Sequence, residues 1–130
     1  MKIALDTNAY SDLQLGKAVQ LKPMVDDAEL LVIPFAVDAE LRAGFKKGSK
    51  EKDNYDKLQR LQELDRVAIL WPDEETNELY AKIWAELSAK GKPIPTNDVW
   101  IAAICLQYHL TLATSDTHFD YVPLLRKIPV

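Results

Sequence analysis

The chain has few of the residues on which several kinds of small protein depend. Cys105 is the only cysteine among 130 residues, and His109 and His118 are the only histidines. This scarcity excludes a disulfide framework, a multi-cysteine zinc or iron–sulfur site and a histidine-rich metal site. No apolar run approaches the ~18 residues of a membrane-spanning helix. The first residues, where Asp6 ends a short apolar run, lack the pattern of a signal peptide. We therefore expect a cytoplasmic protein without a membrane partner.

Carboxylates, by contrast, are abundant. The chain has 20 aspartates and glutamates against 16 lysines and arginines, and its net charge of −4 argues against nucleic-acid binding over the whole surface. Several helical acids have a cation four residues later, as Asp38 has Arg42, which is typical of a solvated helix face. Residues 42–60 are locally basic, with seven cations and three carboxylates. This stretch is consistent with a phosphate-backbone contact or with a solvated helical hairpin.

The length and the spacing of apolar residues predict one α/β domain over residues 1–130. Strands are predicted at 3–5, 30–33, 67–70 and 110–114, with an edge strand within 124–130. Helices are predicted within 10–28, broken near Gly16 and Pro23, and at 36–47, 52–64, 73–90 and 97–108, the last with cap candidates at 96–98. This alternation predicts a parallel sheet of four to five strands, covered by helices on both faces. In such sheets functional side chains gather at the carboxyl ends of the strands.

Four carboxylates are not explained by local pairing. Asp6 ends the first predicted strand, Asp116 follows the fourth, and Asp98 opens the most apolar helix. Glu40 lies on the apolar face of its helix, with no cation three or four residues away. Burying an unpaired carboxylate is costly, so Glu40 in particular needs a partner.

Each acid has a simple alternative explanation, but a shared divalent cation explains all four. Asp98 could cap its helix, and Asp6 and Asp116 could be turn residues. Oxygen-only ligand sets suit Mg²⁺ or Mn²⁺, which bind through a few carboxylates. Polar side chains next to two of these acids could orient them. These supporting residues are Asn8, Thr114 and Ser115.

Four segments, in this order and at this spacing, resemble the PIN-domain nucleases, and most closely the toxin subunits of VapBC toxin–antitoxin modules. The segments are IALDTNAYSDL, AELRAGF, NDVWIAAICLQYHLTLATSD and SDTHF. The resemblance runs from Lys2 to about Val122. It implies a PIN-like three-layer α/β/α sandwich in which four acids hold the metal. The matching acids are Asp6, Glu40, Asp98 and Asp116, supported by Asn8 and Thr114.

Two positions depart from the family pattern. Ser115 stands where many such toxins have a basic or amide residue, and His118 stands where they have an aspartate. For His118 we expect a role in shaping the loop rather than phosphate contact or proton donation. Cys105 and His109 are expected to be packing residues.

The resemblance implies an endoribonuclease that uses Mg²⁺, with Mn²⁺ as a substitute, and hydrolyses RNA through a metal-activated water. Cations after Glu40 would contact the RNA backbone and offset the acidic pocket. These are Arg42, Lys46, Lys47 and Lys50. Two alternatives remain. One is an RNA-processing PIN nuclease that is not a toxin. The other is a receiver-like phosphoacceptor domain with an acidic magnesium pocket, which would need paired acids after the first strand and a lysine near Asp116.

The family also implies two protein partners, a second copy of the chain and a cognate antitoxin whose C-terminal segment covers the active site. A partner arginine could neutralise the acidic pocket. The groove for the antitoxin would lie between the helices at 10–28 and 36–64, whose apolar stripes could instead pack together as core. The stripe residues are Leu13, Leu15, Phe45 and Leu58. The three tryptophans, Trp71, Trp84 and Trp100, are expected in the core.

Overall fold

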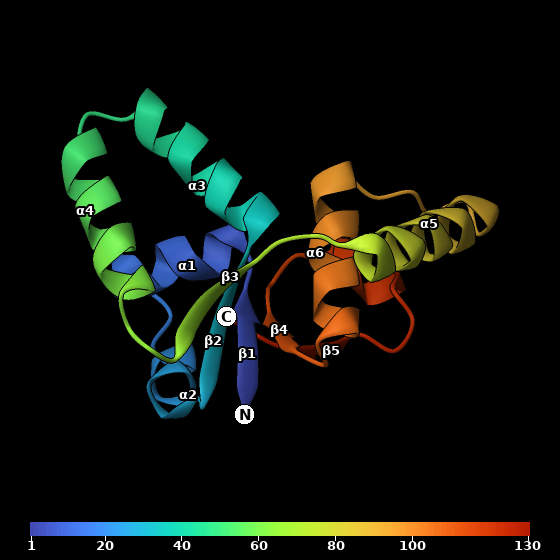
Figure 1. The fold of residues 1–130 in the computed structure, drawn as a ribbon, viewed down its shortest axis with the longest axis horizontal. Helices are drawn as coiled ribbons and strands as arrows, with labels where there is room; N and C mark the ends of the chain where they lie inside the picture. The colour runs from blue at the N-terminus through green and yellow to red at the C-terminus, as the bar shows by residue number, and fades with distance from the viewer.

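A five-stranded parallel sheet forms the centre of the computed structural model, which describes residues 1–130 (Figure 1). The strands are β1 (Lys2–Leu5), β2 (Leu30–Pro34), β3 (Val67–Leu70), β4 (Thr111–Ala113) and β5 (Arg126–Ile128). Their order is β3-β2-β1-β4-β5, and every neighbouring pair is parallel. The predicted parallel sheet and its edge strand are confirmed.

Helices cover both faces of this sheet, which confirms the three-layer architecture. They are α1 (Thr7–Gln14), α2 (Leu21–Asp27), α3 (Phe35–Lys47), α4 (Glu51–Gln62), α5 (Glu74–Ala89) and α6 (Thr96–Gln107), with a 3₁₀ helix η1 (Thr117–Tyr121). Figure 1 shows α1, α2 and α4 on one side of the sheet and α5 and α6 on the other. None of these helices combines the length and apolar character that crossing a membrane requires.

The break predicted between the first two helices occurs at only one of its two expected positions. Gly16 ends the α1 turn with φ +72°, a left-handed conformation that glycine adopts without steric cost. Pro23 instead lies in the first turn of α2. Proline is tolerated there because the first backbone N–H groups of a helix have no partner within it.

The core confirms α6 as the buried helix, excludes two of the three tryptophans expected in it, and decides between the two alternatives for Leu58. Between Val99 and Cys105 only Trp100 is not fully buried. Trp71 and Trp84 were expected in the core, yet they are 64% and 55% exposed. Leu58 is fully buried, so it belongs to the core and not to a groove.

The order of the strands places the ends of β1 and β4 side by side. From β1 the chain passes to β2 on one side, and it later returns to β4 on the other. Leu5 is in register with Ala113, and the Asp6 backbone N–H donates to the Ala113 carbonyl at 3.3 Å. Parallel sheets bind ligands at such a switch point, outside the carboxyl ends of the strands. The residues after β1 and β4 therefore meet at one edge.

Candidate active site

Asp6 is the most buried acid at this edge of the sheet, with 5% of its surface exposed. It is the N-cap of α1, and its Oδ1 accepts a hydrogen bond from the Ala9 backbone N–H at 2.7 Å. Its Oδ2 accepts from the Thr114 hydroxyl at 2.5 Å. Burial raises the pKa of Asp6, as do the nearby charges of Asp116 and Asp98, against the effect of these two hydrogen bonds. Asp6 is thus both a helix cap and a carboxylate under repulsion from other acids.

The Thr114 hydroxyl connects two of the acids. It donates to Asp6 and accepts from the Asp116 backbone N–H at 3.0 Å. Asp116 in turn caps η1, because its Oδ1 accepts from the His118 backbone N–H at 2.9 Å. The structure therefore places Thr114 between Asp6 and Asp116.

Asp98 approaches the same edge from α6. The cap candidates at 96–98 do not cap this helix: the N-cap is Pro95, and no side chain accepts from the first turn. Because Asp98 is the third helical residue, its side chain is free to face His118, whose Nδ1 lies 3.0 Å from Asp98 Oδ2. Burial and the charge of Asp116 raise the pKa of Asp98, and the hydrogen bond with His118 lowers it.

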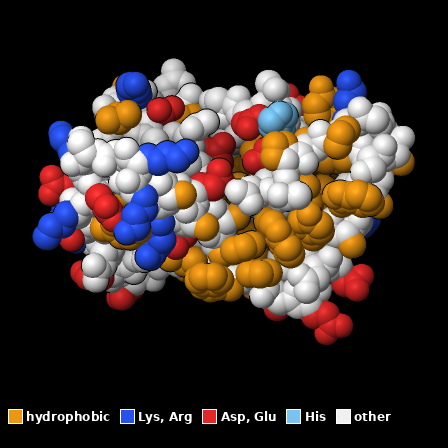
Figure 2. All heavy atoms as spheres, turned by 90° about the horizontal axis from the view of Figure 1, so that it is seen from above, with side chains coloured by type: hydrophobic (Ala, Val, Ile, Leu, Met, Phe, Trp, Pro, Cys, Tyr) orange, Lys and Arg blue, Asp and Glu red, His pale blue; other side chains and the backbone are white.

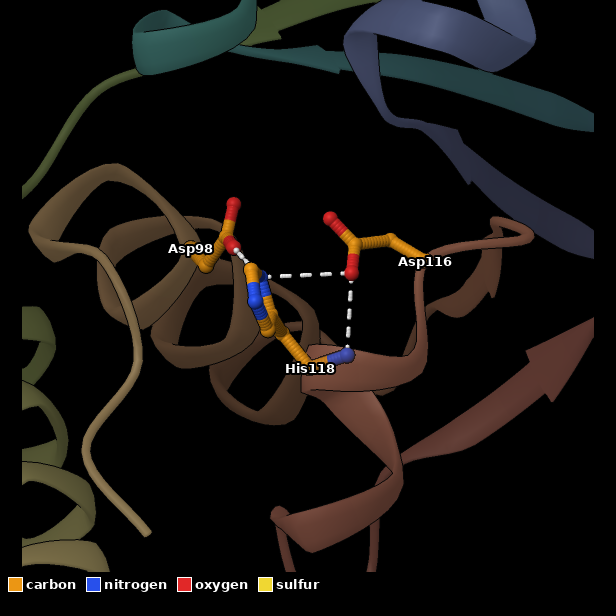
Figure 3. Close-up of side chains that lie close together, drawn as sticks. All are labelled: Asp98, Asp116 and His118. Atoms are coloured by element: carbon orange, nitrogen blue, oxygen red, sulfur yellow. Dashed lines mark hydrogen bonds and ion pairs between the residues drawn. The ribbon is translucent and has the colours of Figure 1, made fainter.

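His118 bridges two acids from different elements. Its Nδ1 lies 3.2 Å from Asp116 Oδ1 as well as 3.0 Å from Asp98 Oδ2 (Figure 3). Its side chain is 47% exposed. The sequence pattern predicted a loop-shaping role for His118; its backbone N–H donates to Asp116, a contact that does not depend on the side chain. The imidazole between the carboxylates was not expected.

Glu40 reaches this region through a contact that the sequence does not reveal. Glu40 is half-buried on α3, and its Oε1 accepts from the Thr7 hydroxyl at 3.1 Å. Thr7 directly follows Asp6, which links the α3 acid to the end of β1. Both residues also line a pocket of about 330 Å³ that contains Leu15 and Phe45.

The other two supporting residues make no contact with the acids. Asn8 is exposed on the first turn of α1 and makes no side-chain hydrogen bond. The exposed Ser115 hydroxyl contacts the backbone of Val130, accepting from its N–H at 3.4 Å. Ser115 therefore faces the end of the chain rather than the acidic site.

Of the four cations after Glu40, two are engaged in ion pairs. Arg42 Nε donates to Asp38 Oδ2 at 2.8 Å, and Lys46 pairs with Glu51 at 2.6 Å. Asp38 is buried and also accepts from Gln62, so its expected place on a solvated helix face is wrong. Gln62, the last residue of α4, donates the hydrogen bond that covers the Asp38 carboxylate. The remaining two cations, Lys47 and Lys50, are exposed and form no ion pair.

The donor set fits a divalent cation. Asp98, Asp116 and His118 each offer one ligand atom, and these atoms all lie within 4.8 Å of one another. The raised pKa values of Asp6 and Asp98 reflect burial and mutual repulsion, which a bound cation would relieve. Carboxylate oxygens are the ligands that Mg²⁺ and Mn²⁺ prefer.

Comparisons with known proteins agree with this geometry. A family model described as the PIN domain matches residues 3–125. The chain is 39% identical over 116 residues to Ribonuclease VapC1 of Haemophilus influenzae (strain R2866), covering 85% of this chain and 83% of that protein. It is 24% identical over 115 residues to Ribonuclease VapC5 of Mycobacterium tuberculosis, covering 88% of this chain and 83% of that protein.

Solved structures give the same result. The structure of VapBC-1 from nontypeable Haemophilus influenzae superposes with a TM-score of 0.87 at 28% identity, over 99% of this chain and 98% of that one. VapBC2 from Rickettsia felis, bound to a promoter DNA fragment, superposes with a TM-score of 0.82 at 26% identity and the same coverage. Because the family model spans nearly all of the sequence and the VapC1 match exceeds one third identity, the chain belongs to the PIN-domain family and, within it, to the VapC ribonucleases.

Proposed function

We propose that this protein is a metal-dependent endoribonuclease and the toxin component of a type II toxin–antitoxin system. The observation that carries the proposal is the convergence of Asp6, Asp98 and Asp116 at the switch point of the sheet, where burial and mutual repulsion raise the pKa of the first two. The relatives named ribonuclease VapC support RNA as the substrate. We infer a cytoplasmic location from the expected RNA substrate.

The acids would contribute to ion binding in different ways. Asp98 and Asp116 would hold it directly, while Thr114 fixes Asp6 and the backbone of Asp116. Glu40 would complete the site from α3. A bound Mg²⁺, or Mn²⁺ in its place, would supply the Lewis-acid chemistry that activates a water and stabilises the leaving oxygen. The products would carry a 3′-hydroxyl and a 5′-phosphate.

The substrate backbone needs cations around this acidic site. Lys47 and Lys50 are free to contact phosphates, whereas Arg42 and Lys46 would first have to leave their carboxylate partners. Exchanging a charged partner for a phosphate is possible for the exposed Lys46. We therefore propose Lys47 and Lys50 as the main backbone contacts among the four.

Cleavage of RNA by the purified chain tests the enzymatic proposal. Wild type in Mg²⁺ should cut RNA into fragments with 5′-phosphates, and EDTA should abolish the cut. Asp6→Asn, which retains a capping oxygen, should fold and lose activity by orders of magnitude. Asp53→Asn is the matched control, because Asp53 is exposed and unpaired. Phosphoryl transfer from acetyl phosphate to the chain, without RNA cleavage, would instead support a receiver-like domain.

For the antitoxin we propose the pocket between α1, α3 and α4. Its lining combines apolar Leu15 and Phe45 with the acid Glu40, which suits an apolar segment that carries an arginine. Leu13 lines a neighbouring cavity that shares Tyr10 and Gln14 with this pocket. Co-purification with the product of the neighbouring small gene should be weakened by Leu15→Glu and not by Leu124→Glu, a change at an exposed leucine elsewhere. A host unaffected by high expression would favour a PIN nuclease that is not a toxin.

For the homodimer we propose an aromatic face. Here Phe35 lies 6.0 Å from Trp71 and 5.6 Å from Trp100, and Tyr80 lies 4.3 Å from Trp100, measured between ring centroids. Figure 2 shows that the molecule has a broad apolar area on one face, next to acidic side chains. Exposed side chains such as that of Trp71, which is 64% exposed, are available to such a surface. Exposed apolar patches of this kind typically mark protein–protein interfaces.

A further inference from the structure

We propose that His118 is a ligand of the active-site metal ion and that its nitrogen makes the site favour Mn²⁺ over Mg²⁺. The inference rests on the proposed metal-dependent function and adds a residue to its ligand set. It concerns the one imidazole in the cluster of Asp98, Asp116 and His118.

The spacing of the side-chain atoms fits shared coordination. Nδ1 of His118 lies 3.0 Å from Asp98 Oδ2 and 3.2 Å from Asp116 Oδ1 (Figure 3). Ligands on adjacent corners of an octahedron with bonds of about 2.1 Å are separated by about 3.0 Å. The imidazole nitrogen therefore already lies at a ligand's distance from both carboxylates. One ion among the three atoms would replace the contacts that they now make with each other.

The backbone holds His118 in place independently of its imidazole. Its N–H donates to Asp116 at 2.9 Å, and the next residue, Phe119, is buried in the core. The loop is thus fixed on both sides without any contribution from the ring. A role limited to shaping the loop would not require the side chain to point between two acids, and the imidazole remains half exposed and accessible to an ion.

A nitrogen donor changes which metal the site prefers. Mg²⁺ takes oxygen ligands in a strict octahedron and keeps several waters. Mn²⁺ shares the preference for carboxylate oxygen, but as a first-row transition ion it also binds sites that mix nitrogen and oxygen ligands. With His118 as a ligand, the affinity for Mn²⁺ relative to Mg²⁺ should therefore exceed that of an all-oxygen site.

Pulsed electron paramagnetic resonance of the Mn²⁺-loaded full chain tests the ligand directly. Coupling of the electron spin to imidazole ¹⁴N should appear in wild type and disappear in His118→Gln. The matched control is His109→Asn, which removes the only other histidine, since asparagine tolerates the φ of +56° at that position. Titration with each metal should show roughly tenfold weaker Mn²⁺ binding in His118→Gln, with a smaller change for Mg²⁺.

Labelling with ¹⁵N-histidine makes the test independent of whether the variant folds. In wild type the nitrogen coupling should change from the ¹⁴N to the ¹⁵N pattern. If Mn²⁺ binds wild type without histidine coupling, the inference is wrong and the proposed nuclease stands. If neither metal binds, or if Asp98→Asn binds as wild type does, the metal site itself fails and the proposed function fails with it.

Discussion

Replacing Thr114 with valine removes one buried hydroxyl and leaves the shape of the side chain nearly unchanged. That hydroxyl donates to the buried Asp6 carboxylate and accepts from the Asp116 N–H. The substitution therefore leaves Asp6 with a single hydrogen-bond donor, the Ala9 N–H. It tests whether the connection between β1 and β4 stabilises the acidic site.

The expected cost follows from the loss of a hydrogen bond to a buried charged group, which contributes about 1.5–3 kcal/mol. The Asp116 N–H is only partly buried and can turn to water, so it adds little. We expect the free energy of unfolding to fall by about 2–3 kcal/mol in EDTA at pH 8. With an unfolding entropy of roughly 2.1 cal/mol/K per residue, this lowers the Tm by about 7–11 °C.

The loss should depend on pH in a direction fixed by the pKa of Asp6. The Thr114 hydrogen bond lowers this pKa and burial raises it, so valine raises it further. A carboxyl with a raised folded-state pKa binds more protons in the native than in the unfolded protein, so it lowers stability as pH rises through that pKa. The difference between wild type and Thr114→Val should therefore be larger at pH 8 than at pH 5.

Urea denaturation in EDTA at both pH values measures this effect, with Thr114→Ser as the control that keeps the hydroxyl. Serine loses only a methyl group and should cost about 1 kcal/mol. If valine and wild type unfold at the same urea midpoint at pH 8, or if serine is as damaging as valine, the hydrogen bond to Asp6 does not stabilise the fold and the reasoning is refuted.

The remaining predictions concern pH, metal, an ion pair and assembly. In EDTA the wild-type free energy of unfolding should fall as pH rises through the raised pKa values of the buried acids, and Asp98→Asn should flatten this dependence in urea titrations. Mg²⁺ or Mn²⁺ at 100 times its Kd should stabilise the protein by about 2.7 kcal/mol, visible as a higher Tm; no shift at any concentration would contradict a metal site. Arg42→Ala should cost about 1–3 kcal/mol of stability because buried Asp38 loses its charged partner, whereas Lys47→Ala should be neutral by calorimetry. Trp71→Ser should shift the chain to monomer in sedimentation equilibrium, and an unchanged dimer would place the interface elsewhere.

Much of the fold could be predicted because its signals are local. Pro72 follows closely after β3, and the strand matches its predicted range of 67–70 residue for residue. β1 ends at Leu5, where the apolar run ends, because the next residue, Asp6, caps α1. Once the sheet is known to be parallel, acids that follow strands must share an edge. This argument alone predicts that Asp6 and Asp116 lie at the same edge of the sheet.

What could not be predicted depends on the direction of side chains and on contacts distant in sequence. Asp38 is buried because Gln62, on the next helix, covers it, and the local pairing with Arg42 does not reveal that contact. The hydroxyl of Ser115 turns toward Val130, although its neighbour Thr114 turns toward the acids. The hydrophobicity of a residue also does not predict whether its side chain is buried in the core or exposed, and Trp71 is an exposed example.

Asp6, Asp98 and Asp116 differ in how their carboxylate oxygens are hydrogen-bonded, and this difference indicates different roles. Both oxygens of Asp6 accept from fixed donors within the protein. Asp98 and Asp116 each use one oxygen, and Figure 3 shows their other oxygens on the same side of the imidazole. The carboxylates of Asp98 and Asp116 bond only to His118, so an ion bound there would replace contacts within the site itself. Asp6, in contrast, is already part of the structure of α1 and β4. Loss of the Asp6 carboxylate should therefore disturb both stability and activity, while loss of the Asp98 carboxylate, which caps no helix, should weaken metal binding in a protein that remains stably folded.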